Sequence, residues 1–152
     1  MSDRQKQLET IAALLREQNT LALSTADKQG QPCVAPLYYF ADDELNLYWL
    51  SSESSLHSEN LRRAPIAAVA IYRPTENWKE IRGVQLRGPV TVISDTTRRR
   101  ALIKAYCKRF QLGAIFKPGI SRCSLYALRP VFLRYIDNSE VFGHSFEIVV
   151  TE

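Results

Sequence analysis

Short apolar segments separated by tight turns constrain this chain more than any other feature of its sequence. Residues 20–25 alternate between apolar and polar side chains, and similar segments at 32–40 and 45–50 follow turns at 26–31 and 42–44. Alternation with a period of two is typical of β-strands, and consecutive strands joined by such short turns run antiparallel. The first third of the chain is therefore predicted to form three meandering strands.

Further strands are predicted at residues 66–72, 79–93 and 123–135, with a short last one at 146–150. The first of these is a near-continuous apolar run that suits a central strand, and the third shows the alternation. Gly83 and Gly88 are expected to bend or bulge the second of these strands, and Pro130 implies an edge or a bulge in the third. Six or so antiparallel strands would expose long unpaired edges unless they closed on themselves. A small antiparallel β-barrel is therefore the expected architecture.

Three segments show the apolar period and the capping residues of helices instead. They are residues 3–18, a short helix that begins at Ser54 or Ser55 and ends near Arg63, and residues 95–110. Residues 111–121, which contain glycine and proline, are expected to form a loop. With 152 residues and no linker, the chain is predicted to be one domain, residues 1–152.

Composition and charge exclude several classes of protein. No apolar stretch approaches the length of about 18 residues that a membrane helix needs, and the N-terminus lacks the apolar region of a signal peptide. No membrane is therefore expected as a partner. Cys33, Cys107 and Cys123 lie far apart, which indicates a reduced, cytoplasmic protein without disulfides, and no metal site is expected. The basic residues at 98–109 lack interleaved aromatics and a recognised motif, so nucleic acid is not expected as a partner either.

The most informative segment is 47–65, where a strand ends in a serine cluster and a helix begins. The unpaired N–H groups of a helix N-terminus bind anions, and serine hydroxyls beside them add donors. Ser51, Ser52 and Ser55 are therefore candidate phosphate ligands, with His57 as a partner that can carry charge. A helix cap in a serine-rich turn would use the same residues without any ligand.

The order of several segments resembles the pyridoxamine 5′-phosphate oxidase-like FMN-binding split-barrel superfamily, and in particular an uncharacterised branch of small bacterial proteins. The matching segments are LALSTADKQGQP (21–32), VAPLYY (34–39), LYWLSS (47–52), SLH (55–57), NLRRAP (60–65) and RGVQLRG (82–88), with DN (137–138) and VFGH (141–144) near the end. The resemblance implies a mainly β fold with α elements, a six-stranded antiparallel split barrel with flanking helices. It also implies a homodimer with FMN in a groove between the subunits.

The resemblance further implies which residues meet the cofactor. Leu50, Ser51 and Ser55 match positions near the flavin phosphate, and Ser52 and His57 lie beside them. One predicted strand matches the strand whose backbone faces the flavin ring, and it contains Val34, Ala35, Pro36 and Leu37. Gln85 lies on a strand that matches the one reaching the site from the partner subunit.

Leu56 and His57 depart from the superfamily pattern, because they stand where the oxidases proper carry an Arg-Lys pair. A neutral histidine donates one weaker hydrogen bond where a cation would form a charge-assisted one. Retention of FMN would then require compensation by Arg62 or by a residue of the other subunit. The C-terminal Trp and Arg motif that holds pyridoxamine phosphate in the oxidases has no match, which argues against that substrate.

Two functional hypotheses follow. In the first, the protein is an FMN-dependent oxidoreductase of unknown small-molecule substrate, in which the flavin supplies the chemistry and no protein acid or base is needed. In the second, it is a non-enzymatic module that binds haem or a flavin, with His57 or His144 as the candidate axial ligands of a haem iron.

Overall fold

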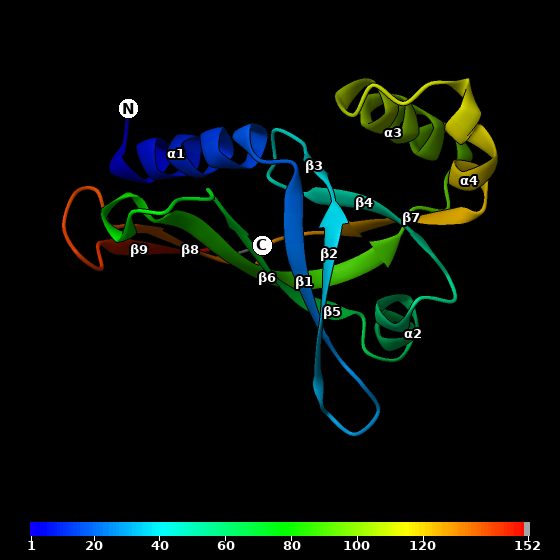
Figure 1. Cartoon of the computed structure of the whole chain (residues 1–152), viewed down its shortest axis with the longest axis horizontal. Coiled ribbons are helices and arrows are strands. Elements are labelled where there is room, and N and C mark those ends of the chain that lie inside the picture. Colours follow the sequence, from blue (N-terminus) through cyan, green and yellow to red (C-terminus); the bar gives the residue numbers. More distant parts are fainter. Residues whose placement is uncertain (151–152) are drawn as a thin grey trace.

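An antiparallel sheet, curved into a split barrel, organises residues 1–150, which are the residues that the computed structural model describes (Figure 1). Its strands are β1 (Thr20–Ala26), β2 (Pro32–Tyr38), β3 (Phe40–Ala41), β4 (Leu47–Ser52), β5 (Ile66–Tyr72), β6 (Arg82–Val92), β7 (Cys123–Leu128), β8 (Phe132–Asp137) and β9 (Ser145–Val149). They are ordered β2-β1-β5-β6-β7-β4-β3, with β8 on β6 and β9 on β8. The helices are α1 (Asp3–Glu17), α2 (Leu56–Arg63), α3 (Thr96–Arg109) and α4 (Lys117–Ser121), with 3-10 turns η1 (Trp78–Glu80) and η2 (Ala114–Phe116).

Strand β6 belongs to both halves of the barrel. Its first part pairs with β5 on one side and with β8 on the other, in the registers Val69↔Leu86 and Leu133↔Leu86. Its last three residues pair with β7 instead. One continuous strand therefore holds the two halves together.

The main core lies between the barrel and α1. Helix α1 buries Ile11, Leu14 and Leu15 against the inward side chains of the strands, among which Trp49 is fully buried. A smaller apolar cluster around Tyr48 and Leu125 packs beneath α3. The two clusters explain why α1 and α3 cover different parts of the barrel (Figure 1).

The structure confirms the split barrel with flanking helices and most of the expected elements. The strand over 66–72 has the predicted bounds, and the helices begin after the predicted caps Ser55 and Asp95. Residues 1–150 contain nine strands instead of six, because two of the expected long strands are each divided and the short last strand β9 also forms. Strand 32–40 breaks at Tyr39, whose ring turns into the core and whose hydroxyl donates to Leu15 O at 2.8 Å.

Three expectations about single elements are wrong. The strand predicted over 123–135 is two strands in different ladders, because the chain turns at Pro130, which has no N–H to donate. The loop expected over 111–121 contains η2 and α4. The three strands of the expected meander also do not form one ladder, because β4 pairs with β3 and β7 rather than with β2.

The connection between β7 and β8 crosses directly over Gly88. Arg129 N donates to Pro89 O at 3.1 Å and Val131 N donates to Arg87 O at 2.9 Å, so the crossing chain is bonded on both sides of the glycine. A Cβ at position 88 would lie 1.9 Å from Arg129 O. Only glycine therefore permits β7 and β8 to lie on the same strand.

We expect Gly88→Ala to lower the free energy of unfolding by about 1–3 kcal/mol or more, because the backbone must separate to admit a methyl group. The measurement is urea unfolding followed by circular dichroism. Gly113→Ala is the matched control, since nothing lies within 4 Å of a Cβ there. Equal free energies of unfolding for the two variants would contradict the close contact between the backbone of Arg129 and Gly88.

Candidate functional site

Ser51, Ser55 and His57 come together where β4 ends and α2 begins. The pairing of β4 with β7 places Ser51 opposite Ser124 and leaves its side chain buried. Ser55 is the N-cap of α2 and its hydroxyl accepts from Ser58 N at 3.4 Å, so the turn between Ser52 and Leu56 has a defined shape. His57 is the second residue of the helix and is carried back toward the strand end.

These three residues form what we call the serine–histidine cluster. His57 Nε2 lies 2.5 Å from Ser51 Oγ and 3.1 Å from Ser55 Oγ, and the two hydroxyl oxygens are 3.2 Å apart. The first N–H groups of α2 have no partner inside the helix, as in any helix N-terminus. The cluster therefore gathers hydroxyls, an imidazole and amide donors around one point, as an anion site requires.

Burial lowers the pKa of His57 below its usual value, because the surroundings disfavour the charged ring. The imidazole is therefore neutral at pH 7. The carboxylate of Glu53, the acidic residue of the same turn, accepts a hydrogen bond from Ser124 Oγ at 2.7 Å instead of pairing with the ring. A neutral ring keeps one nitrogen free to accept a hydrogen bond or a metal, and the other to donate.

Two polar residues predicted near the cluster face elsewhere. The Ser52 hydroxyl is 2.9 Å from Ser54 Oγ and lies at the surface. Arg62 donates to Glu53 O at 2.8 Å and lines a separate cavity of about 180 Å³ together with Ser124. The guanidinium of Arg62 thus does not replace the missing Arg-Lys pair within this chain.

Strand β2 lies against α2 and presents a free edge, because within residues 1–150 its only sheet partner is β1. Val34 and Pro36 point outward and are exposed, whereas Ala35 and Leu37 are half-buried on the opposite face. Leu50 is half-buried in the apolar cluster beneath α3. The backbone of an edge strand keeps unpaired N–H and C=O groups that can meet a ligand.

Gln85 and His144 lie outside the serine–histidine cluster. Gln85 is exposed on the outer face of the sheet, in a depression of about 350 Å³ that Val34 and Arg87 also line. His144 is in the connection between β8 and β9, 3.8 Å from Glu140 Oε2, at the opposite end of the molecule from α2 (Figure 1). Within one chain, Gln85 is therefore not part of the cluster.

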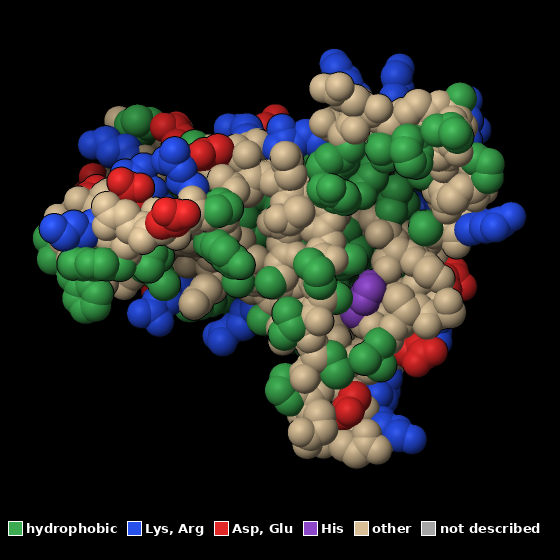
Figure 2. Space-filling model, in the orientation of Figure 1, with side chains coloured by type: hydrophobic (Ala, Val, Ile, Leu, Met, Phe, Trp, Pro, Cys, Tyr) green, Lys and Arg blue, Asp and Glu red, His purple; other side chains and the backbone are tan. Residues whose placement is uncertain are grey.

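The sequence did not reveal an aromatic cluster beside the site. Tyr38 packs on Phe110 at 5.0 Å between ring centroids, Phe110 on Tyr106 at 4.8 Å, and Phe40 on Tyr106 at 6.3 Å. Figure 2 shows apolar side chains gathered below α3, with a histidine beside them near α2. No local pattern could have indicated this cluster, because β2, β3 and α3 meet only in the folded chain.

Comparison with known proteins places this architecture in a family. The family model described as pyridoxamine 5′-phosphate oxidase matches residues 8–136, which include the whole barrel up to β8 and the serine–histidine cluster. The chain belongs to the pyridoxamine 5′-phosphate oxidase family. The sequence therefore predicted the family correctly.

Proteins similar to this chain in sequence include the UPF0306 proteins of Yersinia. The protein from Yersinia pseudotuberculosis is 24% identical over 133 residues, covering 88% of this chain and 86% of its own. Similar solved structures include the conserved hypothetical protein Rv2991 of Mycobacterium tuberculosis (TM-score 0.76, 18% identity, 100% and 93% coverage). HutZ, the haem storage protein of Vibrio cholerae, is also similar (TM-score 0.69, 20% identity, 93% and 92% coverage).

Residues 1–150 contain neither a membrane-spanning helix nor a cluster of metal-ligating side chains. None of their helices is both long enough and apolar enough to cross a membrane. No group of three or more His, Cys, Asp and Glu side chains in this range is arranged to hold a metal ion.

The lowered pKa of His57 makes a testable contribution to stability. As pH falls through the unfolded-state pKa of about 6.5, the unfolded chain takes up a proton at His57 before the folded chain does. The free energy of unfolding of the wild type should therefore decrease between pH 7.5 and 5.5 by more than that of His57→Gln. Urea unfolding at several pH values measures the difference.

His144→Gln is the matched control, because this histidine is more exposed and lies beside a carboxylate. The control should retain the pH dependence attributed to His57. A His57→Gln variant that follows the wild-type profile at every pH would show that the ring is not held in its neutral form.

Proposed function

We propose that this protein binds FMN, with the phosphate at the serine–histidine cluster and the flavin ring against the edge of β2, in a site completed by a second copy of the chain. The observation that carries the proposal is the convergence of Ser51, Ser55 and His57 at the start of α2 in a member of this family. The proposed activity is that of a flavin-dependent oxidoreductase acting on a small molecule.

The donors of the cluster suit a phosphate. Two hydroxyls can each donate one hydrogen bond, His57 can donate another, and the first amides of α2 point in the same direction. The hydroxyls now bond to one another and to the imidazole, so an arriving phosphate would replace hydrogen bonds within the protein. The absence of a cation in the cluster implies weaker binding than an Arg-Lys pair would give.

The surface next to the cluster suits a flat aromatic ring. The edge of β2 offers backbone groups, and Tyr38, Phe40, Tyr106 and Phe110 supply an apolar wall nearby. Ligand sites are commonly apolar with a few placed polar groups, which describes this arrangement. Bound FMN would supply hydride or electron transfer, while the chain would bind it, orient it and exclude water from one face.

The outer face of the sheet is the surface that we propose for the second copy. Val34, Ile66 and Tyr72 are more than half exposed there, and Ala68 and Ala70 between them leave the face nearly flat. Exposed apolar patches of this kind mark interfaces. Packing along this face would also bring Gln85 of one copy toward the β2 edge of the other, as the resemblance implies.

Titration with FMN tests whether the protein binds this cofactor. We expect binding with quenched flavin fluorescence, and we expect Ser51→Ala and Ser55→Ala each to weaken it about tenfold or more, because each removes a hydrogen bond to a charged group. His57→Lys restores a cation and should strengthen it. Ser54→Ala is the matched control in the same turn, since Ser54 bonds only to the exposed Ser52. No binding at tens of micromolar FMN would contradict the proposal.

Light scattering tests whether two copies of the chain form a dimer. The wild type should have about twice the chain mass of 17.4 kDa. Ala68→Arg should be monomeric and should lose FMN affinity, because a long charged side chain cannot be buried in that face without a partner. Ala101→Arg, at an exposed position of α3, is the control and should stay dimeric. A monomeric wild type that still binds FMN would show that FMN binding does not require the dimer.

Haem binding is the second candidate, because a solved neighbour with this fold is named as a haem storage protein. A neutral, half-buried imidazole such as that of His57 is a suitable axial ligand. Titration with haem distinguishes the two candidates. A Soret band that disappears in His57→Ala, in a protein that does not bind FMN, would favour haem. A band that survives in both His57→Ala and His144→Ala would exclude the two histidines as axial ligands.

A further inference from the structure

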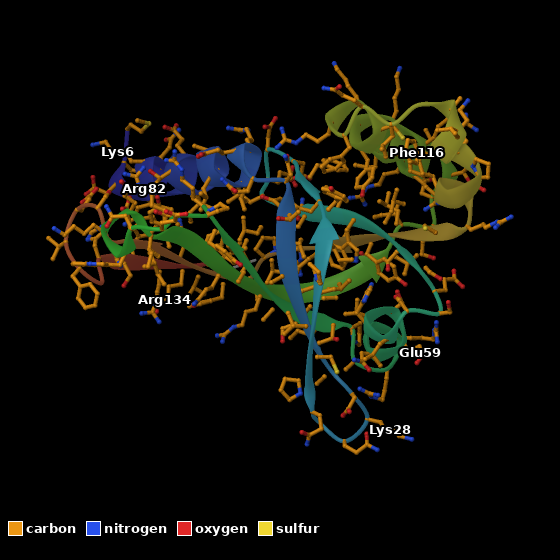
Figure 3. All side chains as sticks on the ribbon, viewed as in Figure 1. Lys6, Lys28, Glu59, Arg82, Phe116 and Arg134 are labelled. Atoms are coloured by element: carbon orange, nitrogen blue, oxygen red, sulfur yellow. The ribbon has the colours of Figure 1, made fainter. Side chains whose placement is uncertain are left out.

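The segment Asp95–Arg122, which we call the arm, is weakly packed on the barrel. It contains η2 and both α3 and α4, yet Tyr106 is its only fully buried side chain. Ile115 is 85% exposed and Phe116, which Figure 3 labels within the arm, is about half exposed. An apolar segment left this open is typical of a surface that binds something.

A groove of about 750 Å³ runs between α3 and α4. Its apolar lining includes Ile103, Leu112 and Ile120, and cationic side chains surround it, among them Arg100, Lys104 and Lys117. No acidic residue lines the groove. Within residues 1–150, none of these three cations forms an ion pair.

The charge of the groove distinguishes among occupants. A second copy of the chain would bring the same cationic arm or a surface of a protein with net charge +4, and like charges at an interface are unfavourable. An apolar chain with a negative group at one end matches both the lining and the rim. The volume lies within the range of about 300–1,000 Å³ that small-molecule sites occupy.

From this match we infer that the groove between α3 and α4 binds a long-chain anionic amphiphile, such as a fatty acid, with its alkyl chain on Ile103, Leu112 and Ile120. The carboxylate lies at the cationic rim formed by Arg100, Lys104 and Lys117. This site is separate from the serine–histidine cluster and does not depend on the proposed FMN binding.

The test uses a fluorescent 18-carbon fatty acid at concentrations where it is monomeric, displaced by saturated fatty acids of 10 to 16 carbons. Each methylene that enters the groove should strengthen binding about fourfold until the groove is filled. The methyl ester of the best acid should bind at least tenfold more weakly, because it lacks the charge. Binding without dependence on chain length or on charge would overturn the inference.

Two variants with matched controls locate the site. Lys104→Glu combined with Lys117→Glu should weaken binding at least tenfold. Lys6→Glu combined with Lys28→Glu changes the net charge equally at positions far from the arm and should leave binding unchanged (Figure 3). Ile120→Gln should also weaken binding, and Val141→Gln, at an exposed apolar position near the β8–β9 connection, should not.

A membrane surface is the occupant to exclude. Sedimentation with vesicles of anionic phospholipid, in the same buffer, measures it directly. Binding to vesicles but not to monomeric fatty acid would overturn the inference in favour of a membrane-docking arm. Failure of both, in a protein whose circular dichroism shows the native helix content, would show that the groove has no anionic amphiphile ligand.

Discussion

The crossing of residues 129–131 over Gly88 determines where almost everything else in this protein lies. Because no side chain separates the two backbones, β7 and β8 can both pair with β6, one near each end of that strand. The pairing of β7 then fixes β4, and β4 ends at the turn from which α2 begins. The serine–histidine cluster is thus positioned by a contact in which none of its own residues takes part.

His57 gives the cluster a different electrostatic character from that of an Arg-Lys pair. A permanent cation would attract a dianion at any pH, whereas the neutral imidazole offers a directional hydrogen bond and no charge. Its bonds to Ser51 and Ser55 also keep the hydroxyls satisfied when no ligand is bound. A histidine in place of the Arg-Lys pair lowers the expected affinity for FMN. It also lowers the free-energy cost of leaving the site without a ligand, and it provides a nitrogen that could bind iron.

Local sequence signals predicted the elements better than their partners. Alternation located β1, a near-continuous apolar run located β5, and the serine and aspartate caps located α2 and α3, because these signals act within a few residues. Pro130 indicated an edge or a bulge in 123–135, but its division into two strands was missed, since the crossing also depends on Gly88, more than 30 residues earlier in the chain. The serines and His57 of the site could be predicted because they are close in sequence. The aromatic wall could not, because Tyr38 and Phe110 meet only through the fold.

The arm is attached to the rest of the chain by α3, through Tyr106, the small apolar cluster beneath the helix and hydrogen bonds from Arg98, Arg99 and Arg109, whereas η2 and α4 bury no side chain. A segment with so few buried side chains contributes little to the cooperative unfolding of the whole domain and can open on its own. Substitutions in η2 and α4 should therefore be nearly free of folding constraints. Evolution could exchange the arm for one of another length or polarity while the barrel stays unchanged, and descendants of this chain could differ in what they bind without differing in architecture.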